Sequence, residues 1–298
     1  MTQNPTPLWN VDGPSLVVQG DNLNFLKSLP SESMNLIYVD PPFNTGKVQS
    51  RTSYKSQRNI EGSRMGFKGQ SYNFVKEKVT SYNDAFEDYW GFLEPRIEEA
   101  WRILKPNGTF YLHLDYREVH YAKVLLDSLF GIESFLNEII WAYDYGARSK
   151  SKWPTKHDNI LVYVKDPENY VFNNLAVDRE PYMAPGLVTK EKAELGKLPT
   201  DVWWHTIVSP TGKEKTGYAT QKPEGILRRI IQASSMEGDW VMDFFGGSGT
   251  TGAVAAKLNR RFVLVDQNPE AIDVIRKRIG NGTLDSTVSY INLEEISQ

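Results

Sequence analysis

The chain has 298 residues, of which 40% are hydrophobic and 24% charged, which is the composition of a globular protein and not of a disordered one. It contains no cysteine, so disulfides, thiolate metal sites and mechanisms with a cysteine nucleophile are excluded. The net charge of −3 is a weak overall indication of nucleic-acid binding.

The first part of the chain alternates short apolar runs with helical patterns. Residues 15–20 and 35–39 predict buried strands, and residues 22–29 predict a short helix between them. The second strand must end at residues 40–42, because the two prolines there cannot donate to a sheet ladder. Residues 44–80 have little periodicity and predict a long loop or an inserted segment.

The middle of the chain predicts a helix over residues 84–104, where apolar side chains recur at spacings of three and four, followed by a turn at 106–108. Further expected elements are a strand at 109–114, a helix at 117–129, a strand at 138–143 and a hairpin strand at 160–164. His113 lies within one of these strands, where we expect a hydrogen-bonded structural role. Residues 145–158 and 166–216 are expected to be irregular.

The last third of the chain returns to a regular alternation. The expected elements are helices at 223–235, 250–258 and 269–279, strands at 240–245 and 261–265, and a weakly structured tail from residue 280. Strands that alternate with helices indicate an α/β fold with a doubly wound parallel sheet. No apolar run reaches the roughly 20 residues that span a bilayer. The first residues lack a secretory pattern, so we expect a cytoplasmic protein without a membrane segment.

Positive charge is concentrated in two segments of this acidic chain. Residues 47–78 hold eight cations and two glutamates, a net charge of +6. A second basic stretch contains Arg148, Lys150, Lys152 and Lys156. A solvated loop is one interpretation of either stretch. The two together also fit a surface that contacts phosphates.

A glycine-rich motif, DFFGGSGTTG at 243–252, leaves one expected strand and enters the next helix. Its glycines allow the backbone to turn tightly and to approach a ligand closely. Asp266 ends the following strand, where a carboxylate can accept hydrogen bonds from ribose hydroxyls. The pattern indicates a cofactor that carries adenosine, and it fits NAD and S-adenosylmethionine equally well. A glycine turn without a ligand is the alternative.

A second motif, Asp40-Pro41-Pro42-Phe43, follows the strand at 35–39. The exocyclic amine of a nucleobase is a poor nucleophile, so a site that methylates it needs acceptors for the amino hydrogens. Asp40 would supply a carboxylate, and Pro41 a rigidly held carbonyl. Phe43 would supply an aromatic face for a base that has left the duplex. A simple turn that ends the strand is the alternative.

Together the two motifs resemble motifs IV and I of amino-methylating DNA methyltransferases, and their order, with DPPF first, resembles the permuted β class of that family. Other stretches that carry the resemblance are GDN at 20–22, DPPFNTG at 40–46, KPNGTFYLH at 105–113, KHDNILVY at 156–163 and TQKPEGILRRII at 220–231. In combination these motifs are very specific.

The resemblance implies a Rossmann-like, S-adenosylmethionine-dependent methyltransferase fold with a circularly permuted, doubly wound sheet. Its catalytic domain would comprise residues 1–46, 81–144 and 217–298, with a basic insert at 47–80 and a target-recognition region at 145–216. The strand before the glycine motif and the strand before DPPF would lie side by side, so the two motifs would line one crevice.

The resemblance also implies which residues hold the cofactor S-adenosyl-L-methionine. They are Asp21, Asp40, Lys222, Pro223, Phe245, Gly246, Gly247, Gly249, Thr250 and Asp266. Catalysis would depend on Asp40, Pro41, Pro42 and Phe43, and no metal is expected. For Asp21 a helix N-cap is the alternative, and for Lys222 an ordinary lysine at a helix start.

The implied function is site-specific methylation of adenine N6 in double-stranded DNA after base flipping. An aspartate at position 40 resembles the adenine-N6 members of the family, whereas serine there resembles cytosine-N4 members. The alternatives are a cytosine-N4 methyltransferase, a non-catalytic DNA-binding module, a methyltransferase for RNA or protein, and a nicotinamide-dependent oxidoreductase. A homodimer and a companion restriction endonuclease are further expectations of the family.

Overall fold

The computed structural model describes residues 8–43, 47–58, 64–65, 71–84, 88–146, 148–209, 211–280 and 288–296. The chain divides into two compact units, of which the first comprises Met1–Pro41 and Trp90–Gln298 and the second Pro42–Tyr89. Within the described residues, no helix is both long enough and apolar enough to cross a membrane.

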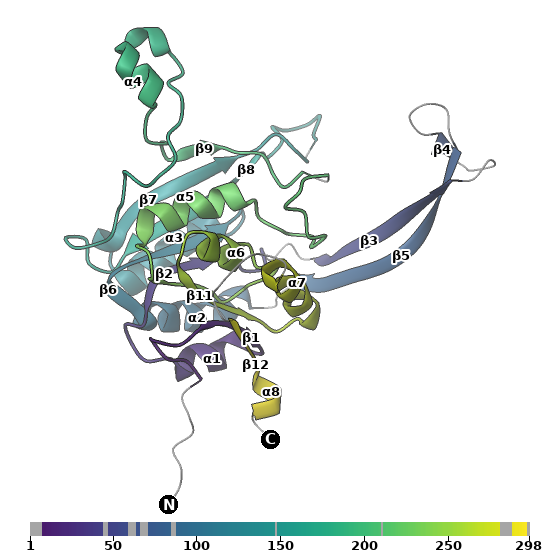
Figure 1. The fold of residues 1–298 in the computed structure, drawn as a ribbon, viewed down its shortest axis with the longest axis horizontal. Coiled ribbons are helices and arrows are strands. Elements are labelled where there is room, and N and C mark those ends of the chain that lie inside the picture. Colours follow the sequence, from purple (N-terminus) through teal and green to yellow (C-terminus); the bar gives the residue numbers. More distant parts are fainter. Residues whose placement is uncertain are drawn as a thin grey trace, which may run out of the picture. The chain divides into compact units, whose positions relative to one another are not determined.

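The first unit is built on a mixed, nine-stranded sheet (Figure 1). Its strands, in their order across the sheet, are β12 (Val288–Asn292), β1 (Ser15–Gln19), β11 (Arg261–Asp266), β10 (Trp240–Asp243), β2 (Met34–Val39), β6 (Leu104–Leu114), β8 (His157–Val164), β7 (Phe135–Ala142) and β9 (Val202–Trp204). All neighbours from β12 to β6 are parallel, whereas β8 is antiparallel to both β6 and β7. The expected α/β fold is therefore confirmed, with an antiparallel part added to the parallel sheet.

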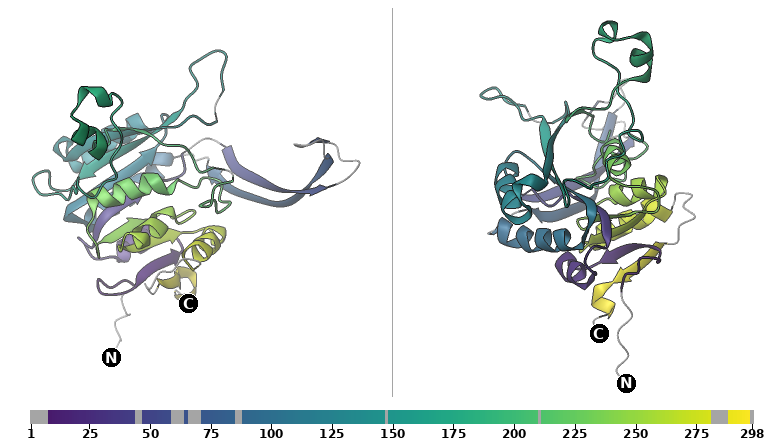
Figure 2. Two further views of the ribbon diagram at one scale, coloured as in Figure 1. Left: turned by 45° about the horizontal axis from the view of Figure 1, so that its top comes forward. Right: turned by 90° about the vertical axis from the view of Figure 1, so that its left-hand side faces the viewer.

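Helices cover both faces of this sheet (Figure 2). On one face lie α5 (Glu224–Ser234), α6 (Thr250–Lys257) and α7 (Pro269–Gly280), whose buried aliphatic side chains share one core with the strands. On the other lie α1 (Asn22–Ser28), α2 (Tyr89–Ile103) and α3 (Val119–Phe130). The short elements η1 (Ile132–Ser134), η2 (Pro185–Leu187), α4 (Lys190–Leu195) and α8 (Leu293–Ile296) complete the unit.

The strands that precede the two sequence motifs are neighbours at the centre of the sheet. β10 pairs in parallel with β2, with Val241 opposite Leu36 and Met242 opposite Ile37. This confirms the predicted juxtaposition. The chain continues from β10 to β11 on one side and from β2 to β6 on the other. Connections that diverge in this way leave a crevice at the carboxyl ends of the two strands, which is where open α/β sheets bind ligands.

Residues 44–80 were expected to be a long loop or an inserted segment, and the loop is wrong for the described residues among them, which lie in strands. β3 (Lys47–Arg58) and β5 (Ser71–Asp84) pair as a long antiparallel ribbon in the second unit, and β4 (Arg64–Met65) pairs with β5. Main-chain hydrogen bonds hold such a ribbon together, so its sequence needs no apolar alternation.

Two further expectations at element ends were wrong. The tail beyond residue 280 contains β12, which extends the sheet beside β1. The expected turn at 106–108 belongs to β6, and the register against β2 shifts between Met34 and Leu36, so the extra residues of β6 form a bulge.

Candidate active site

The glycine motif turns sharply between β10 and α6. Gly247 and Gly249 have φ angles of 50° and 72°, a backbone region that favours glycine. The N–H of Gly246 donates to the carbonyl of Val265 at 2.9 Å, and the N–H of Gly249 donates to the carbonyl of Gly246 at 2.7 Å. The loop is therefore closed on itself and fastened to β11, next to the end of β2.

Two carboxylates hold the backbone of this loop in place. Asp266, at the end of β11, accepts the N–H of Gly247 at 2.8 Å. Asp243, at the end of β10, accepts the N–H of Phe245 at 3.0 Å and the hydroxyl of Thr251 at 2.7 Å. Both acids are therefore part of the architecture of the loop, and each can still accept further hydrogen bonds.

The pKa values of these two acids reflect their burial. Burial raises the pKa of Asp243 to about 7, the bonds from Thr251 and Phe245 oppose this, and the negative charges of Asp40 and Asp266 add to the rise. Burial likewise raises the pKa of Asp266, although its backbone hydrogen bonds counteract the shift. Three carboxylates thus share one electrostatic environment at the carboxyl end of the sheet.

Asp40 follows β2 at this edge and forms an ion pair with Lys222. Its Oδ2 atom lies 2.5 Å from Nζ of Lys222, and the two side chains are only 16% and 13% exposed. The hydroxyl of Thr250, at the start of α6, donates to the carbonyl of Lys222 at 3.0 Å. Lys222 therefore connects the helix of the glycine motif to the acid of the DPPF motif.

The second oxygen of Asp40 has an unmet hydrogen-bonding capacity. Oδ1 is buried and, within the described part of the chain, accepts no hydrogen bond. This atom lies 4.0 Å from Nδ1 of His113. Buried carboxylate oxygens are normally hydrogen-bonded, because leaving one unpaired is costly. The atom is available to a donor that a ligand would bring.

Near Asp40, several buried polar side chains are linked by hydrogen bonds. Nδ1 of His113 is 2.7 Å from the hydroxyl of Tyr38, and Nε2 is 3.3 Å from Asp158, which also accepts the hydroxyl of Tyr143 at 3.0 Å. A carboxylate can only accept, so Nε2 of His113 carries a proton and donates it to Asp158. The expected hydrogen-bonded role of His113 is confirmed.

The partners of Asp158 also decide its charge. Burial alone would raise its pKa, but the hydrogen bond and charge of His113, the charge of Lys222 and the hydroxyl of Tyr143 outweigh it, and the net pKa is lowered. Asp158 is therefore an anion that anchors the chain of hydrogen bonds.

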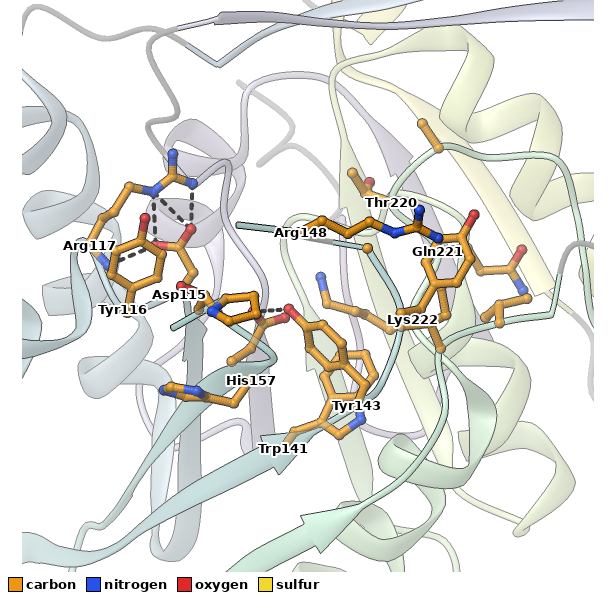
Figure 3. A pocket seen from close by; sticks show the side chains of 18 of the residues that line it. Asp115, Tyr116, Arg117, Trp141, Tyr143, Arg148, His157, Thr220, Gln221 and Lys222 are labelled. Atoms are coloured by element: carbon orange, nitrogen blue, oxygen red, sulfur yellow. Dashed lines mark hydrogen bonds and ion pairs between the residues drawn. The ribbon is translucent and has the colours of Figure 1, made fainter. Parts of the chain in front are cut away.

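Lys222 also lines a pocket of about 580 Å³ (Figure 3). Its walls consist of Asp115, Tyr116 and Arg117 together with some of the described residues between 141 and 158 and between 207 and 222. Its aromatic lining residues are Tyr116, Trp141, Tyr143 and Tyr145, and its cationic ones are Arg117, Arg148, Lys152, Lys215 and Lys222. Such a combination of flat rings and positive charge suits a nucleic acid, whose bases stack and whose phosphates attract cations.

Most of the residues expected from sequence to hold the cofactor gather at one edge. Asp40, Lys222, Thr250 and Asp266 are linked to the glycine loop by the hydrogen bonds described above. Pro223 is the N-cap residue of α5 and follows Lys222 directly.

Phe245 and Asp21 lie nearby but contact other protein groups. The ring of Phe245 packs against Phe92, with ring centroids 6.0 Å apart. Asp21 caps α1 by accepting the N–H of Asn24 at 3.0 Å and pairs with Arg96 at 3.0 Å. The N-cap alternative for Asp21 is confirmed, and its contact with a cofactor stays a prediction.

Pro41 is the last residue of the first of the two segments that make up the first unit, and Pro42 and Phe43 begin the second unit. The roles expected for these three residues stay predictions.

Several residues of the site were not predicted as such. Asn22 donates to the carbonyl of Phe244 at 2.7 Å and accepts from Nε of Arg96 at 2.6 Å, which joins α1 and α2 to the glycine motif. Asn22 belongs to the GDN stretch, so its motif was visible, but its partner was not. Asp158 lies in the stretch KHDNILVY, which pointed to the residue without indicating a role.

Comparison with known proteins identifies similar sequences. The family model N6_N4_Mtase, described as DNA methylase, matches residues 34–277. The DNA adenine methyltransferase YhdJ of Escherichia coli strain K12 is 32% identical over 290 residues, which cover 95% of this chain and 86% of the relative. The type II methyltransferase M.HpaI of Haemophilus parainfluenzae is 31% identical over 256 residues, which cover 85% of this chain and 70% of the relative.

Comparison with solved structures shows a shared fold. The crystal structure of the M1.HpyAVI–SAM complex aligns with a TM-score of 0.57 at 20% identity, covering 89% of this chain and 98% of that one.

Proposed function

The chain belongs to the N6_N4_Mtase family of DNA methylases, and from this premise we propose that it transfers a methyl group from S-adenosylmethionine to N6 of adenine in double-stranded DNA. The observation that carries the proposal is the pairing of Asp40 with Lys222 beside the glycine loop, with one carboxylate oxygen left for a ligand. Adenine is supported by the similarity to YhdJ, which is named a DNA adenine methyltransferase, and by the aspartate at position 40.

The charge of the crevice fits S-adenosylmethionine better than a nicotinamide dinucleotide. Asp40, Asp243 and Asp266 lie close enough for two of them to raise the pKa of the third, and Lys222 is paired with only one of these acids. A cationic sulfonium and an α-amino group relieve this excess of negative charge, whereas a pyrophosphate would add to it. When bound, S-adenosylmethionine supplies an electrophilic methyl group that the target amine can displace directly.

The residues of the chain would divide the binding task between them. Asp266 would accept the ribose hydroxyls, and the positive φ angles of Gly247 and Gly249 would let the backbone approach the cofactor. Thr250 and Pro223 would fix the position of Lys222 at the start of the two helices. Gly246 would fasten the loop to β11 through the hydrogen bond from its N–H to the carbonyl of Val265.

Asp40 would act on the acceptor. Its free Oδ1 atom and the carbonyl of Pro41 would accept hydrogen bonds from the target amine as positive charge develops on nitrogen. Lys222 would keep the other oxygen oriented, so that the carboxylate has a single direction in which to bind. Pro42 would stiffen the backbone, and Phe43 would stack on the extruded base. Holding both reactants in this way supplies much of the rate.

The target base of the DNA would enter the cationic, aromatic pocket that Lys222 lines. We propose residues 145–216 as the target-recognition region, apart from β8 and β9, which belong to the sheet. We propose residues 47–80 as a basic insert that contacts DNA. Residues 1–46, 81–144 and 217–298 would form the catalytic domain. The position of β10 and β11 between β1 and β2 supports assignment to the permuted β class.

Methyl transfer in vitro tests the proposal. Purified chain would be incubated with methylation-free genomic DNA and tritiated S-adenosylmethionine, and the digested nucleosides would be separated by mass. We expect N6-methyldeoxyadenosine with the wild type and none with Asp40→Ala, while both bind S-adenosylhomocysteine in calorimetry through Asp266. N4-methyldeoxycytidine as the product would instead identify a cytosine enzyme, and an active Asp40→Ala variant would contradict the mechanism.

Sequencing of the same DNA would give the recognition sequence. Relatives such as M.HpaI are type II methyltransferases, so a companion restriction endonuclease and a homodimer are further parts of the proposal. Sedimentation velocity checks the second of these, because a monomer at all concentrations would contradict it.

A further inference from the structure

The loop between β7 and β8 presents a tryptophan to solvent. Trp153 is 94% exposed, although an indole has about 150–250 Å² of surface to bury. The loop is closed at its base, where the N–H of Tyr143 donates to the carbonyl of Lys156 at 2.9 Å. It is also shaped just before the tryptophan, because Ser149 Oγ accepts the N–H groups of Ser151 and Lys152 at 3.2 and 3.1 Å. The backbone on both sides of Trp153 is therefore hydrogen-bonded within the loop.

The charge around this ring selects a nucleic acid as its partner. The segment 143–156 contains four cations, which are Arg148, Lys150, Lys152 and Lys156, against the single acid Asp144. Within the described residues, neither Arg148 nor Lys152 forms an ion pair with a carboxylate. A flat, exposed aromatic ring in a loop that carries cations without a carboxylate partner matches a polymer that has both base faces and phosphates.

The position of the ring relates it to the pocket. Lys152 and Pro154, the residues on either side of Trp153, both line the pocket that Lys222 also lines. Arg148, from the same loop, lines that pocket together with Lys222 (Figure 3). Trp153 itself does not line the pocket, but it lies in the chain between two residues that do. A duplex that delivers a base into the pocket would meet the indole where the base leaves the stack.

We propose that Trp153 inserts into double-stranded DNA beside the target base and fills the space that the base vacates when it enters the pocket. The inference rests on the proposed function, and it assigns to Trp153 the stabilisation of the opened duplex. An aromatic ring can replace the stacking that the neighbouring base pairs lose, and every base offers it a face.

Two duplexes with the recognition sequence separate this role from general binding. In one the target adenine is paired with thymine, and in the other it faces an abasic site and is already unpaired. We expect Trp153→Ala to lower the single-turnover rate of methylation on the paired duplex about tenfold, which lies within the range for loss of one base–aromatic stack. On the abasic duplex its rate should be within about twofold of the wild type, because opening no longer limits the reaction.

Matched variants make the result specific. Trp153→Phe keeps a flat ring and should retain most of the rate on the paired duplex. Tyr121→Ala removes another exposed aromatic ring, on α3, and should match the wild type on both duplexes. Circular dichroism and binding of S-adenosylhomocysteine should be the same for all variants.

Two results would overturn the inference. Trp153→Ala could match the wild type on both duplexes, or it could lose the same factor on both, which would indicate a general contact with DNA and no part in opening the duplex. Both results require a wild type that methylates DNA. A wild type without any methyl transfer would refute the proposed function instead, so the two failures are distinguishable.

Discussion

The ion pair between Asp40 and Lys222 predicts a strong coupling between two residues that are far apart in the sequence. At 2.5 Å and an effective dielectric constant of about 20, two unit charges attract by about 7 kcal/mol. Each ion loses hydration worth several kcal/mol at a site this buried, which offsets most of that attraction. We therefore expect a net coupling energy of about 2 kcal/mol between the two side chains.

A double-mutant cycle measures this coupling. Lys222→Met leaves the carboxylate of Asp40 buried without its cation and should cost about 3 kcal/mol of unfolding free energy. Asp40→Asn should cost less, because an amide replaces the carboxylate and the lysine can shift toward the pocket. The double variant should be more stable than the sum of the two losses predicts by about 2 kcal/mol.

Urea denaturation monitored by circular dichroism gives the four free energies. Repeating the cycle in 1 M salt serves as a control, since a buried pair is screened much less than an exposed one. Losses that add to within about 0.5 kcal/mol would refute the reasoning, because they would mean that the two groups do not interact in the folded protein.

Two further predictions concern the glycine motif. Burial raises the pKa of Asp243 from 3.8 to about 7, so its contribution to stability is full below pH 3.8 and is lost as the pH rises through 7. Between pH 5 and 8 the wild type should therefore lose about 3 kcal/mol relative to Asp243→Asn in urea denaturation, and parallel curves for the two proteins would contradict this. Gly249→Ala places a methyl group 2.8 Å from Ile275 at a φ of 72° and should cost about 3 kcal/mol, whereas Gly238→Ala, at a φ of 82° in open space, should cost only about 1 kcal/mol. Equal losses of unfolding free energy for the two variants would contradict a contribution from the clash with Ile275 and would leave backbone strain as the only cause.

The parts of the fold that were predictable from sequence are those with fully buried runs. β2 and β10 are buried at every position, so their residues stand out as apolar runs. β12, by contrast, is only half-buried throughout, and β9 has three residues with one of them buried. Edge strands of this kind leave too little apolar pattern to be recognised.

In the site, too, the sequence motifs pointed to the residues, but the hydrogen bonds between those residues could not be predicted. Asp40 and Lys222 were predicted to act together on one cofactor, but the direct bond between them joins residues 182 positions apart. Likewise, the contact between His113 and Asp158 depends on the register that places His113 opposite Ile160 on the neighbouring strand. Register of this kind depends on which strands pair and on which of their faces are buried together, so the sequence of one strand alone does not give it.

A crystal structure of the chain with S-adenosylmethionine tests most directly whether the ends of β2 and β10 enclose one cofactor. We predict that the ribose hydroxyls bind Asp266, that the backbone of Gly247 lies against the ligand, and that the methionine end reaches the Asp40–Lys222 pair. A ligand bound elsewhere, or one that contacts the glycine loop while Asp40 remains remote from it, would contradict the proposed active site.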